Sequence, residues 1–362
     1  MNINIFPFFL MVVFSFNLLN QKANAWGGRG HDTICRVAVY LVKEKDLKEY
    51  LQNKPQMMGH LCNMPDFYWK SLSGDATKLG NSTHFIDLEI TDMKLSEVPE
   101  DYQKIVDKYT GTPNRAKEGS TIFSVPTEFG SVWWRADQFI RRIAGLEKEF
   151  KTANLPANKA DFQNNDLPYN KAVSQMIIDM GLMGHFVGDN SQPFHVTVDY
   201  DGWMTGHGGI HAYYEDTAVS FFDGDLDAIV LKKARALKKE KFLTAPTTVQ
   251  KMKELALVSQ KELPQIFKLD PIIKKSEVVR EKGMEIKKDA ERQPGIVGHK
   301  RFAPMIMNQL ARSAALLAVM WDEAYVKAGR PTLAAYKSYK YPFTVDFVAP
   351  DYFIEPGKAE KK

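Results

Sequence analysis

Five residues near the middle of the chain have the types and spacing of a metal site: His185, Asp189, His195, His211 and Glu215. Imidazole nitrogens and carboxylate oxygens are the ligands that a divalent ion such as zinc accepts. Each of the two His-x3-acid pairs would share one face of a helix, because residues four apart lie on the same side. Two such pairs with a third histidine between them predict a site for several metal ions.

Helices are the elements expected to position these residues. Apolar side chains recur at helical spacing after Gly30, within residues 132–150, within about 170–189 and within about 305–327. The third of these helices would carry His185 and Asp189 at its C-terminal end. The Gly- and Asp-rich segment 189–209 is predicted to be largely loop. The sequence contains no internal repeat and no strand-rich region, so we expect a single all-α domain.

The first 25 residues have the features of a secretory signal peptide. They hold a short apolar run and end at Ala23-Asn24-Ala25, a small-residue cleavage pattern. Cleavage would leave Trp26 as the N-terminus of a secreted or periplasmic protein. The alternative is an uncleaved membrane anchor, and no later segment is expected to be apolar enough to span a bilayer.

Net charge and cysteine content say less about function than the candidate metal ligands do. Removing Lys22 with the signal lowers Lys+Arg from 48 to 47 against 44 acids, a net charge of +3 that does not by itself indicate nucleic acid. The Lys-rich region 231–288 is predicted to be helical, and either solvated or attractive to phosphate-bearing polymers or anionic membranes. Cys35 and Cys62 could form a disulfide or remain two buried thiols. We expect a monomer with no obligate protein partner.

Together with four upstream residues, the five central residues form a pattern that resembles the zinc-dependent nuclease and phospholipase C superfamily. The four are Trp26, His31, Asp66 and His84. This superfamily includes the fungal single-strand-specific nucleases S-one and P-one and the bacterial zinc phospholipases C. The matching motifs are Trp26-Gly27-Gly28-Arg29-Gly30-His31, Pro65-Asp66, His84-Phe85-Ile86-Asp87, His185-x3-Asp189, Gln192-Pro193-Phe194-His195 and His211-x3-Glu215. They span residues 26–215.

The resemblance implies a mostly helical domain at residues 26–340, a C-terminal tail at 341–362, and three zinc ions at the bottom of a cleft. One ion would bind Asp66, His84, His185 and Asp189. A second would bind the N-terminal amine and carbonyl of Trp26, His31 and a bridging Asp189. The third would bind His195, His211 and Glu215.

The resemblance also implies phosphodiester hydrolysis. Adjacent zinc ions can lower the pKa of a shared water, and a third ion can offset charge on a phosphate oxygen. Asp66 would orient or deprotonate that water. Phe85 and Asp87 would stack on a nucleic-acid base and hydrogen-bond its edge, although the phospholipases carry a similar pair.

Several positions depart from the family pattern. The spacing from Trp26 to His31 is nuclease-like, whereas Glu215 is the choice of the phospholipases. Trp69 stands where the nucleases place a Lys or Arg. Lys70, the next residue, could contact the substrate in its place, although on a helix its side chain is expected to point about 100° away from that position. We therefore expect a secreted nuclease acting on single-stranded nucleic acid. Phospholipase C activity on phosphatidylcholine is the alternative, and a non-catalytic zinc-binding exported protein is the second.

Overall fold

The computed structural model describes residues 26–281 and 284–354. The predicted signal peptide, residues 1–25, and the end of the predicted tail, residues 355–362, lie outside the described residues. Helix accounts for 57% of the structure and strand for 6%, which confirms the expectation of a mostly helical protein.

The elements follow one another along the chain. The α-helices are α1 (Gly27–Ala38), α2 (Lys45–Leu51), α3 (Pro55–Phe67), α4 (Asp75–Leu79), α5 (Gln103–Tyr109), α6 (Val125–Glu128), α7 (Val132–Gly145), α8 (Glu147–Thr152), α9 (Pro168–Asp189), α10 (Ile210–Ala212), α11 (Ala218–Ser220), α12 (Leu226–Ala236), α13 (Lys241–Thr244), α14 (Thr248–Gln260), α15 (Leu263–Leu269) and α16 (Gly295–Lys327). The short 3-10 helices are η1 (Trp69–Ser71), η2 (Asn81–Thr83), η3 (Leu88–Ile90), η4 (Leu95–Glu97), η5 (Asp161–Gln163) and η6 (Pro193–His195), and η7 (Tyr213–Thr217) is a π-helix. The strands are β1 (Ile272–Lys274), β2 (Glu277–Glu281), β3 (Met284–Lys288) and β4 (Glu291–Arg292).

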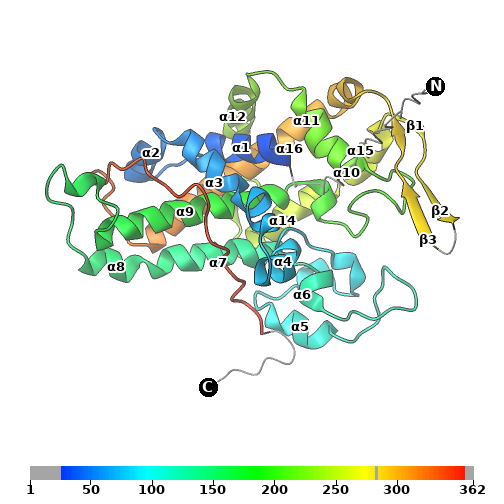
Figure 1. The fold of residues 1–362 in the computed structure, drawn as a ribbon, viewed down its shortest axis with the longest axis horizontal. Helices are drawn as coiled ribbons and strands as arrows, with labels where there is room; N and C mark the ends of the chain where they lie inside the picture. The colour runs from blue at the N-terminus through cyan, green and yellow to red at the C-terminus, as the bar shows by residue number, and fades with distance from the viewer. Residues whose placement is uncertain (1–25, 282–283, 355–362) are drawn as a thin grey trace, which may run out of the picture.

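The long helices pack side by side into one bundle. Helix α9 contacts α3 and α7, and α1 contacts α3, α9 and α16 (Figure 1). Almost every residue of α9 from Met176 to Asp189 is buried, because neighbouring helices surround it. The bundle therefore brings the last turn of α9, which carries His185 and Asp189, into the interior beside α1 and α3.

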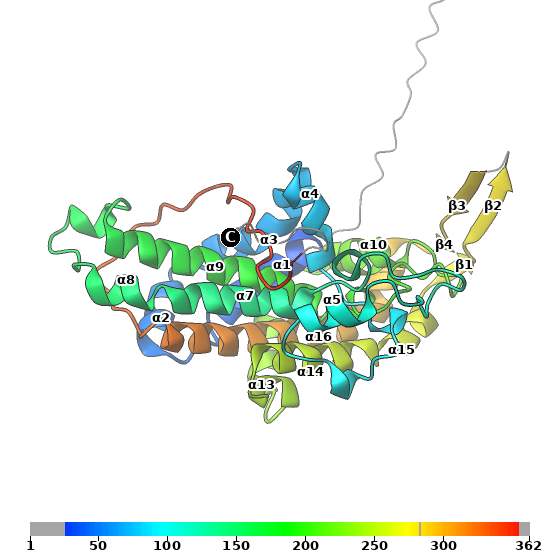
Figure 2. The ribbon, with the colours of Figure 1, turned by 90° about the horizontal axis from the view of Figure 1, so that it is seen from below.

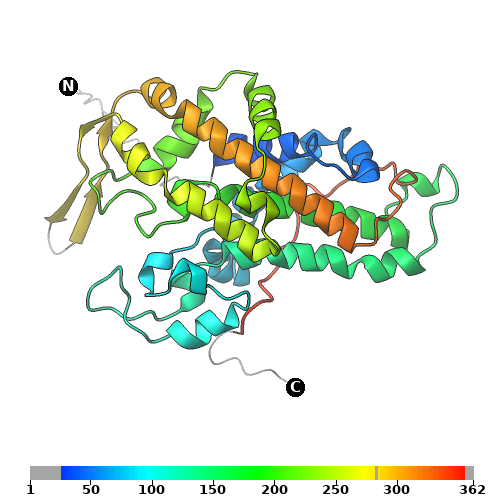
Figure 3. The same cartoon turned by 180° about the vertical axis from the view of Figure 1, so that it is seen from behind.

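Helix α16 crosses the back of the bundle along its full length (Figure 3). It begins at Gly295, ten residues before the predicted start, and continues through Pro304. By length and composition it could cross a membrane, so the expectation that no later segment is apolar enough was wrong. However, 61% of its apolar window is buried inside the protein, as in the core helix of a globular protein.

The Lys-rich region 231–288 is only partly helical, so that prediction was wrong in two places. Helix α12 ends at Ala236, and Lys239 adopts a left-handed backbone conformation with φ of 58° before α13 begins. After α15 the chain forms strands: β1 pairs with β4, and β2 pairs with β3 as an antiparallel hairpin that projects from the body (Figure 2). The β-branched residues between Ile272 and Ile286 favour this extended conformation over helix.

The C-terminal strap, residues 341–354, lies along α7 and past α3 (red in Figure 1). Its backbone carbonyls accept hydrogen bonds from two buried side chains of α7: Arg135 binds the carbonyl of Val348, and Gln138 binds that of Ala349. The described part of the predicted tail is thus part of the packed structure.

Cys35 of α1 and Cys62 of α3 are joined by a disulfide, with their Cα atoms 6.4 Å apart. A Cβ atom at Gly184 of α9 would collide with the Cys35 sulfur, so only glycine allows α9 to pack this closely. The disulfide thus lies against the helix that carries His185.

We expect the double variant C35S/C62S to be less stable by about 3 kcal/mol, because the bond closes a loop of 27 residues and restricts the unfolded chain. Urea unfolding of the wild-type protein and the double variant measures this difference, under conditions that keep the wild-type disulfide formed. A stability unchanged within about 0.5 kcal/mol would contradict it.

Candidate metal centre

Three groups of buried His, Asp and Glu side chains could each hold a metal ion. Within each group the candidate ligand atoms lie within 4.8 Å of one another. The groups are His31, His185 and Asp189; Asp66, His84 and His185; and His195, His211 and Glu215. All eight side chains were predicted as metal ligands, and the fold brings them together from α1, α3, the residue after η2, α9, η6, α10 and η7.

The first two groups share His185, and the Asp189 carboxylate lies between their other histidines, His31 and His84. One carboxylate oxygen, Oδ1, lies 3.3 Å from His31 Nε2. The other, Oδ2, lies 2.8 Å from His84 Nδ1 and 3.3 Å from His185 Nε2. A carboxylate with its two oxygens facing two sets of imidazoles has the arrangement needed to bridge two ions.

Neighbouring carbonyls fix which nitrogen of two histidines can bind a metal ion. His185 Nδ1 lies 2.9 Å from the carbonyl of Cys62, and His195 Nδ1 lies 2.7 Å from the carbonyl of His84. A carbonyl oxygen can only accept a hydrogen bond, so Nδ1 must carry the proton in both rings. In the neutral form of each ring, Nε2 then carries the lone pair and faces the cluster, as in metal sites whose ligands are oriented by a second layer of hydrogen bonds.

The third group is held where the chain leaves the loop 189–209. His211 Nε2 lies 3.1 Å from His195 Nε2 and 2.9 Å from Glu215 Oε2. Glu215 lies in the π-helix η7, an irregular turn of a type often found at functional sites. Gln192 donates a hydrogen bond of 2.7 Å to Glu215 Oε2, which orients the carboxylate.

Trp26 lies fully buried beside this third group. Its backbone nitrogen donates to Glu215 Oε2 at 3.0 Å, and its indole donates to the carbonyl of Gly188 at 2.9 Å. The resemblance paired the Trp26 amine with His31 and Asp189, whereas here its nitrogen contacts the acid of the third group. The start of α1 is thus anchored among the candidate ligands.

Burial and charge set the protonation of these side chains. Burial lowers the pKa of His84, His195 and His211 to about 4, so these rings are neutral at pH 7 and can donate lone pairs. Burial also acts on His185, but the carboxylates of Asp189 and Asp66 outweigh it and raise its pKa to about 9. Conversely, burial opposes the charge on those two carboxylates, but the neighbouring cations outweigh it and lower both pKa values.

The donor set fits metal ions for a further reason. Buried polar atoms normally have hydrogen-bond partners, and an unpaired one is costly. Several candidate ligand atoms have no hydrogen-bond partner within the described part of the chain: His31 Nε2, Asp66 Oδ2, Asp189 Oδ1 and Glu215 Oε1. Cations bound between these carboxylates would offset the cost of burying their charge.

We expect metal affinity to rise with pH up to about pH 9. Below that pH the metal-free protein holds a proton on His185, and an ion bound at Nε2 must displace it. The raised pKa favours the metal-free form as pH falls, so the affinity should drop by up to about tenfold per pH unit. Zinc titration against a competing chelator between about pH 6.5 and 8.5 measures this slope, and a flat profile would contradict it.

Lys70 reaches the cluster, so the expectation that it points away was wrong. Its Nζ lies 2.5 Å from Asp66 Oδ1. Lys70 follows Asp66 by four residues, but α3 ends at Phe67, so Lys70 reaches Asp66 from the 3-10 turn η1. Burial opposes the charge of Lys70, but the Asp66 carboxylate outweighs it and raises the pKa of the lysine.

A cleft of about 860 Å³ opens over the second and third groups. The predicted substrate-contact residues Phe85, Asp87 and Lys70 line it, together with the ligands His84, His195 and His211. Sequence reasoning missed Asn81, Asn114, Lys117, Tyr200 and Met204, which also line the cleft. Asn114 and Lys117 lie between His84 and His185 in sequence, and only the folded chain brings them to this wall.

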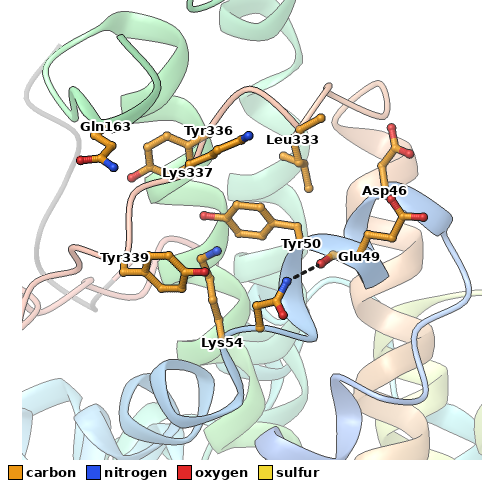
Figure 4. A pocket seen from close by; sticks show the side chains of 11 residues that line it. Asp46, Glu49, Tyr50, Lys54, Gln163, Leu333, Tyr336, Lys337 and Tyr339 are labelled. Atoms are coloured by element: carbon orange, nitrogen blue, oxygen red, sulfur yellow. Dashed lines mark hydrogen bonds between the residues drawn. The ribbon is translucent and has the colours of Figure 1, made fainter. Parts of the chain in front are cut away.

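A second cleft of about 420 Å³ lies between the α2–α3 turn and residues 331–340 (Figure 4). The Lys54 ammonium lies 3.9 Å from the centroid of the Tyr50 ring and 4.5 Å from that of Tyr339. None of the three metal-ligand groups of the described residues lines this cleft. The two rings offset the buried charge of Lys54, which gives this contact a role in packing.

Neither protein-family models nor curated proteins gave a match to this chain. The family resemblance therefore stays a proposal. The site itself indicates the kind of function. Three buried groups of His, Asp and Glu could hold metal ions, and residues of two of these groups line one cleft.

Proposed function

We propose that this protein is an exported zinc-dependent phosphodiester hydrolase that cuts single-stranded nucleic acid. The observation that carries the proposal is the presence of three groups of potential metal ligands, the second of which includes the Lys70-paired Asp66, with a cleft over the second and third groups. A site that only stabilised the fold would not need a buried Asp66 paired with the half-buried Lys70 next to an open cleft.

Zinc is the metal that best suits these donors. Imidazole nitrogen and carboxylate oxygen in compact, buried groups are typical zinc ligands, whereas magnesium and calcium prefer sets made of oxygen alone. When bound, zinc would lower the pKa of a water molecule and offset the negative charge of a phosphate.

Asp66 is the side chain proposed to act on the attacking water. Its lowered pKa keeps the carboxylate ionised at neutral pH, so it can accept a hydrogen bond from the water and orient it; as a carboxylate it is also the group proposed to take the proton. Lys70 lies beside it and remains charged, so it can offset the charge that develops on the phosphate oxygens during displacement.

Phe85 and Asp87 support nucleic acid as the substrate. Phe85 is half-buried in the cleft wall and leaves an aromatic face on which a base could stack. Burial, with Glu89 nearby, raises the pKa of Asp87 well above its ordinary value. A protonated carboxyl can donate as well as accept a hydrogen bond, which suits the mixed edge of a base.

Phosphatidylcholine is the second candidate substrate. Met204 and Tyr200 line the cleft and are 67% and 56% exposed, so they give its mouth an apolar side that could meet a lipid surface. Glu215 also favours phosphatidylcholine, because the phospholipases that the chain resembles carry Glu at this position.

One assay set decides between these substrates. Mature protein beginning at Trp26 is loaded with zinc and offered single-stranded DNA, RNA and lecithin while phosphate-ester cleavage is followed. We expect cleavage of the nucleic acids. Cleavage of lecithin alone would refute the nuclease, and three bound zinc ions without any cleavage would refute the enzyme. His211→Ala should lose activity, whereas His299→Ala, a histidine bonded to the carbonyl of Ala218, is the matched control.

A further inference from the structure

The turn that carries Lys70 has little support from its own backbone. Helix α3 ends at Phe67, and residues Trp69–Ser71 form a single 3-10 turn, η1. Short 3-10 turns have weaker hydrogen-bond geometry than α-helices, so tertiary contacts must decide how such a turn is rotated. Its rotation sets whether the Lys70 side chain faces Asp66.

Trp69, the residue before Lys70, is the anchor of this turn. Its side chain is 3% exposed and points away from the metal ligands, towards the C-terminal strap. The indole Nε1 donates a hydrogen bond of 2.7 Å to the carbonyl of Val345. The ring of Phe347 meets the indole edge to face, with centroids 5.2 Å apart.

The strap is in turn fixed by a buried arginine. Arg135 of α7 is fully buried, its guanidinium lies over the Trp69 ring at 5.5 Å, and it donates to the carbonyl of Val348 at 2.5 Å. A buried cation needs acceptors, and the strap carbonyl supplies one. Trp69 is therefore held between α7 and the strap.

We propose that Trp69 is a positioning residue: held by the C-terminal strap, it turns η1 so that Lys70 faces Asp66. This inference rests on the proposed function, because Lys70 matters for catalysis only if the cleft hydrolyses phosphodiesters. It assigns the strap, more than 270 residues from Lys70 in sequence, a role in the arrangement of the site.

A double-mutant cycle between Trp69→Phe and Lys70→Ala tests the coupling. Phenylalanine keeps an aromatic ring but cannot donate to Val345, so Trp69→Phe should lower kcat by about tenfold with bound zinc unchanged. If Trp69 acts through Lys70, adding Trp69→Phe to Lys70→Ala should change kcat by less than about twofold. An equal loss in both backgrounds, or no loss in either, would overturn the inference.

The control variant is Tyr352→Phe, which removes a hydrogen bond of 2.8 Å between the other end of the strap and Ser131. It weakens the strap without touching Trp69, so kcat should stay within about twofold of the wild-type value. A tenfold loss in Tyr352→Phe would show that the strap acts through general stability, which would also overturn the inference.

A crystal structure of metal-free Trp69→Phe gives a readout that does not depend on activity. We expect the Lys70 ammonium to leave Asp66, and an unchanged contact of 2.5 Å would refute the positioning role. The two proposals can thus fail separately: a wild-type protein that cuts nothing refutes the function, while the crystal structure still decides what Trp69 does.

Discussion

Asp66→Asn is expected to lower kcat by about 10³-fold or more while at least two zinc ions remain bound. Asparagine is nearly the same size, but it cannot accept a proton and has one oxygen instead of two. A positioned general base contributes about 10² to 10⁴ in rate, and Asp66 also neutralises Lys70. Steady-state kinetics on single-stranded DNA, combined with metal analysis of the same sample, measures both quantities.

The matched control is Asp179→Asn. Asp179 is also buried and also pairs with a cation, Arg142 at 3.2 Å, but it lies far along α9 from the ligands. This variant should lose stability yet keep kcat. Normal turnover in Asp66→Asn would refute the role assigned to Asp66. Equal losses of kcat in both variants would show that removing any buried carboxylate has this effect, which would also refute the role.

The second large effect concerns the N-terminus. A chain that retains even one residue before Trp26 is expected to bind two zinc ions instead of three and to lose activity. The Trp26 nitrogen lies within the ligand groups, 3.0 Å from Glu215, and Trp26 itself is fully buried. An amide nitrogen has no lone pair available for a metal ion, whereas a free amine has one.

Metal analysis of the extended chain, before and after a protease removes the extension, measures this change. Cleavage should restore the third zinc ion and the activity, and an extension at the C-terminus serves as the control. Three equivalents of zinc in the N-terminally extended chain would contradict the proposal. The same result would remove the reason for proposing that export and cleavage behind Ala25 precede activity.

The helices that position the site could be largely predicted from the sequence. The helix predicted at residues 132–150 corresponds to α7 and α8, and the one predicted at about 170–189 corresponds to α9. These predictions succeed because apolar spacing directly reflects which face of a helix is buried. The start of α16 and the strands after Ile272 could not be predicted in this way. Their conformation depends on partners distant in sequence, as in the pairing of Ile272 with Arg292.

For the site, the sequence by itself determined the types of the ligands and their local pairing. His185 and Asp189 share a face of α9 because the helix repeat places them there, whatever the rest of the chain does.

Only the tertiary structure decided how those pairs combine. The position of Asp189 between His31 and His84, the contact of Trp26 with Glu215 and the rotation of the turn that carries Lys70 each depend on contacts between segments distant in sequence. The spacing of residues along a chain sets local geometry over one or two turns. The distance between residues 26 and 215, or the rotation of a short turn held by residue 345, is set by packing across the whole fold.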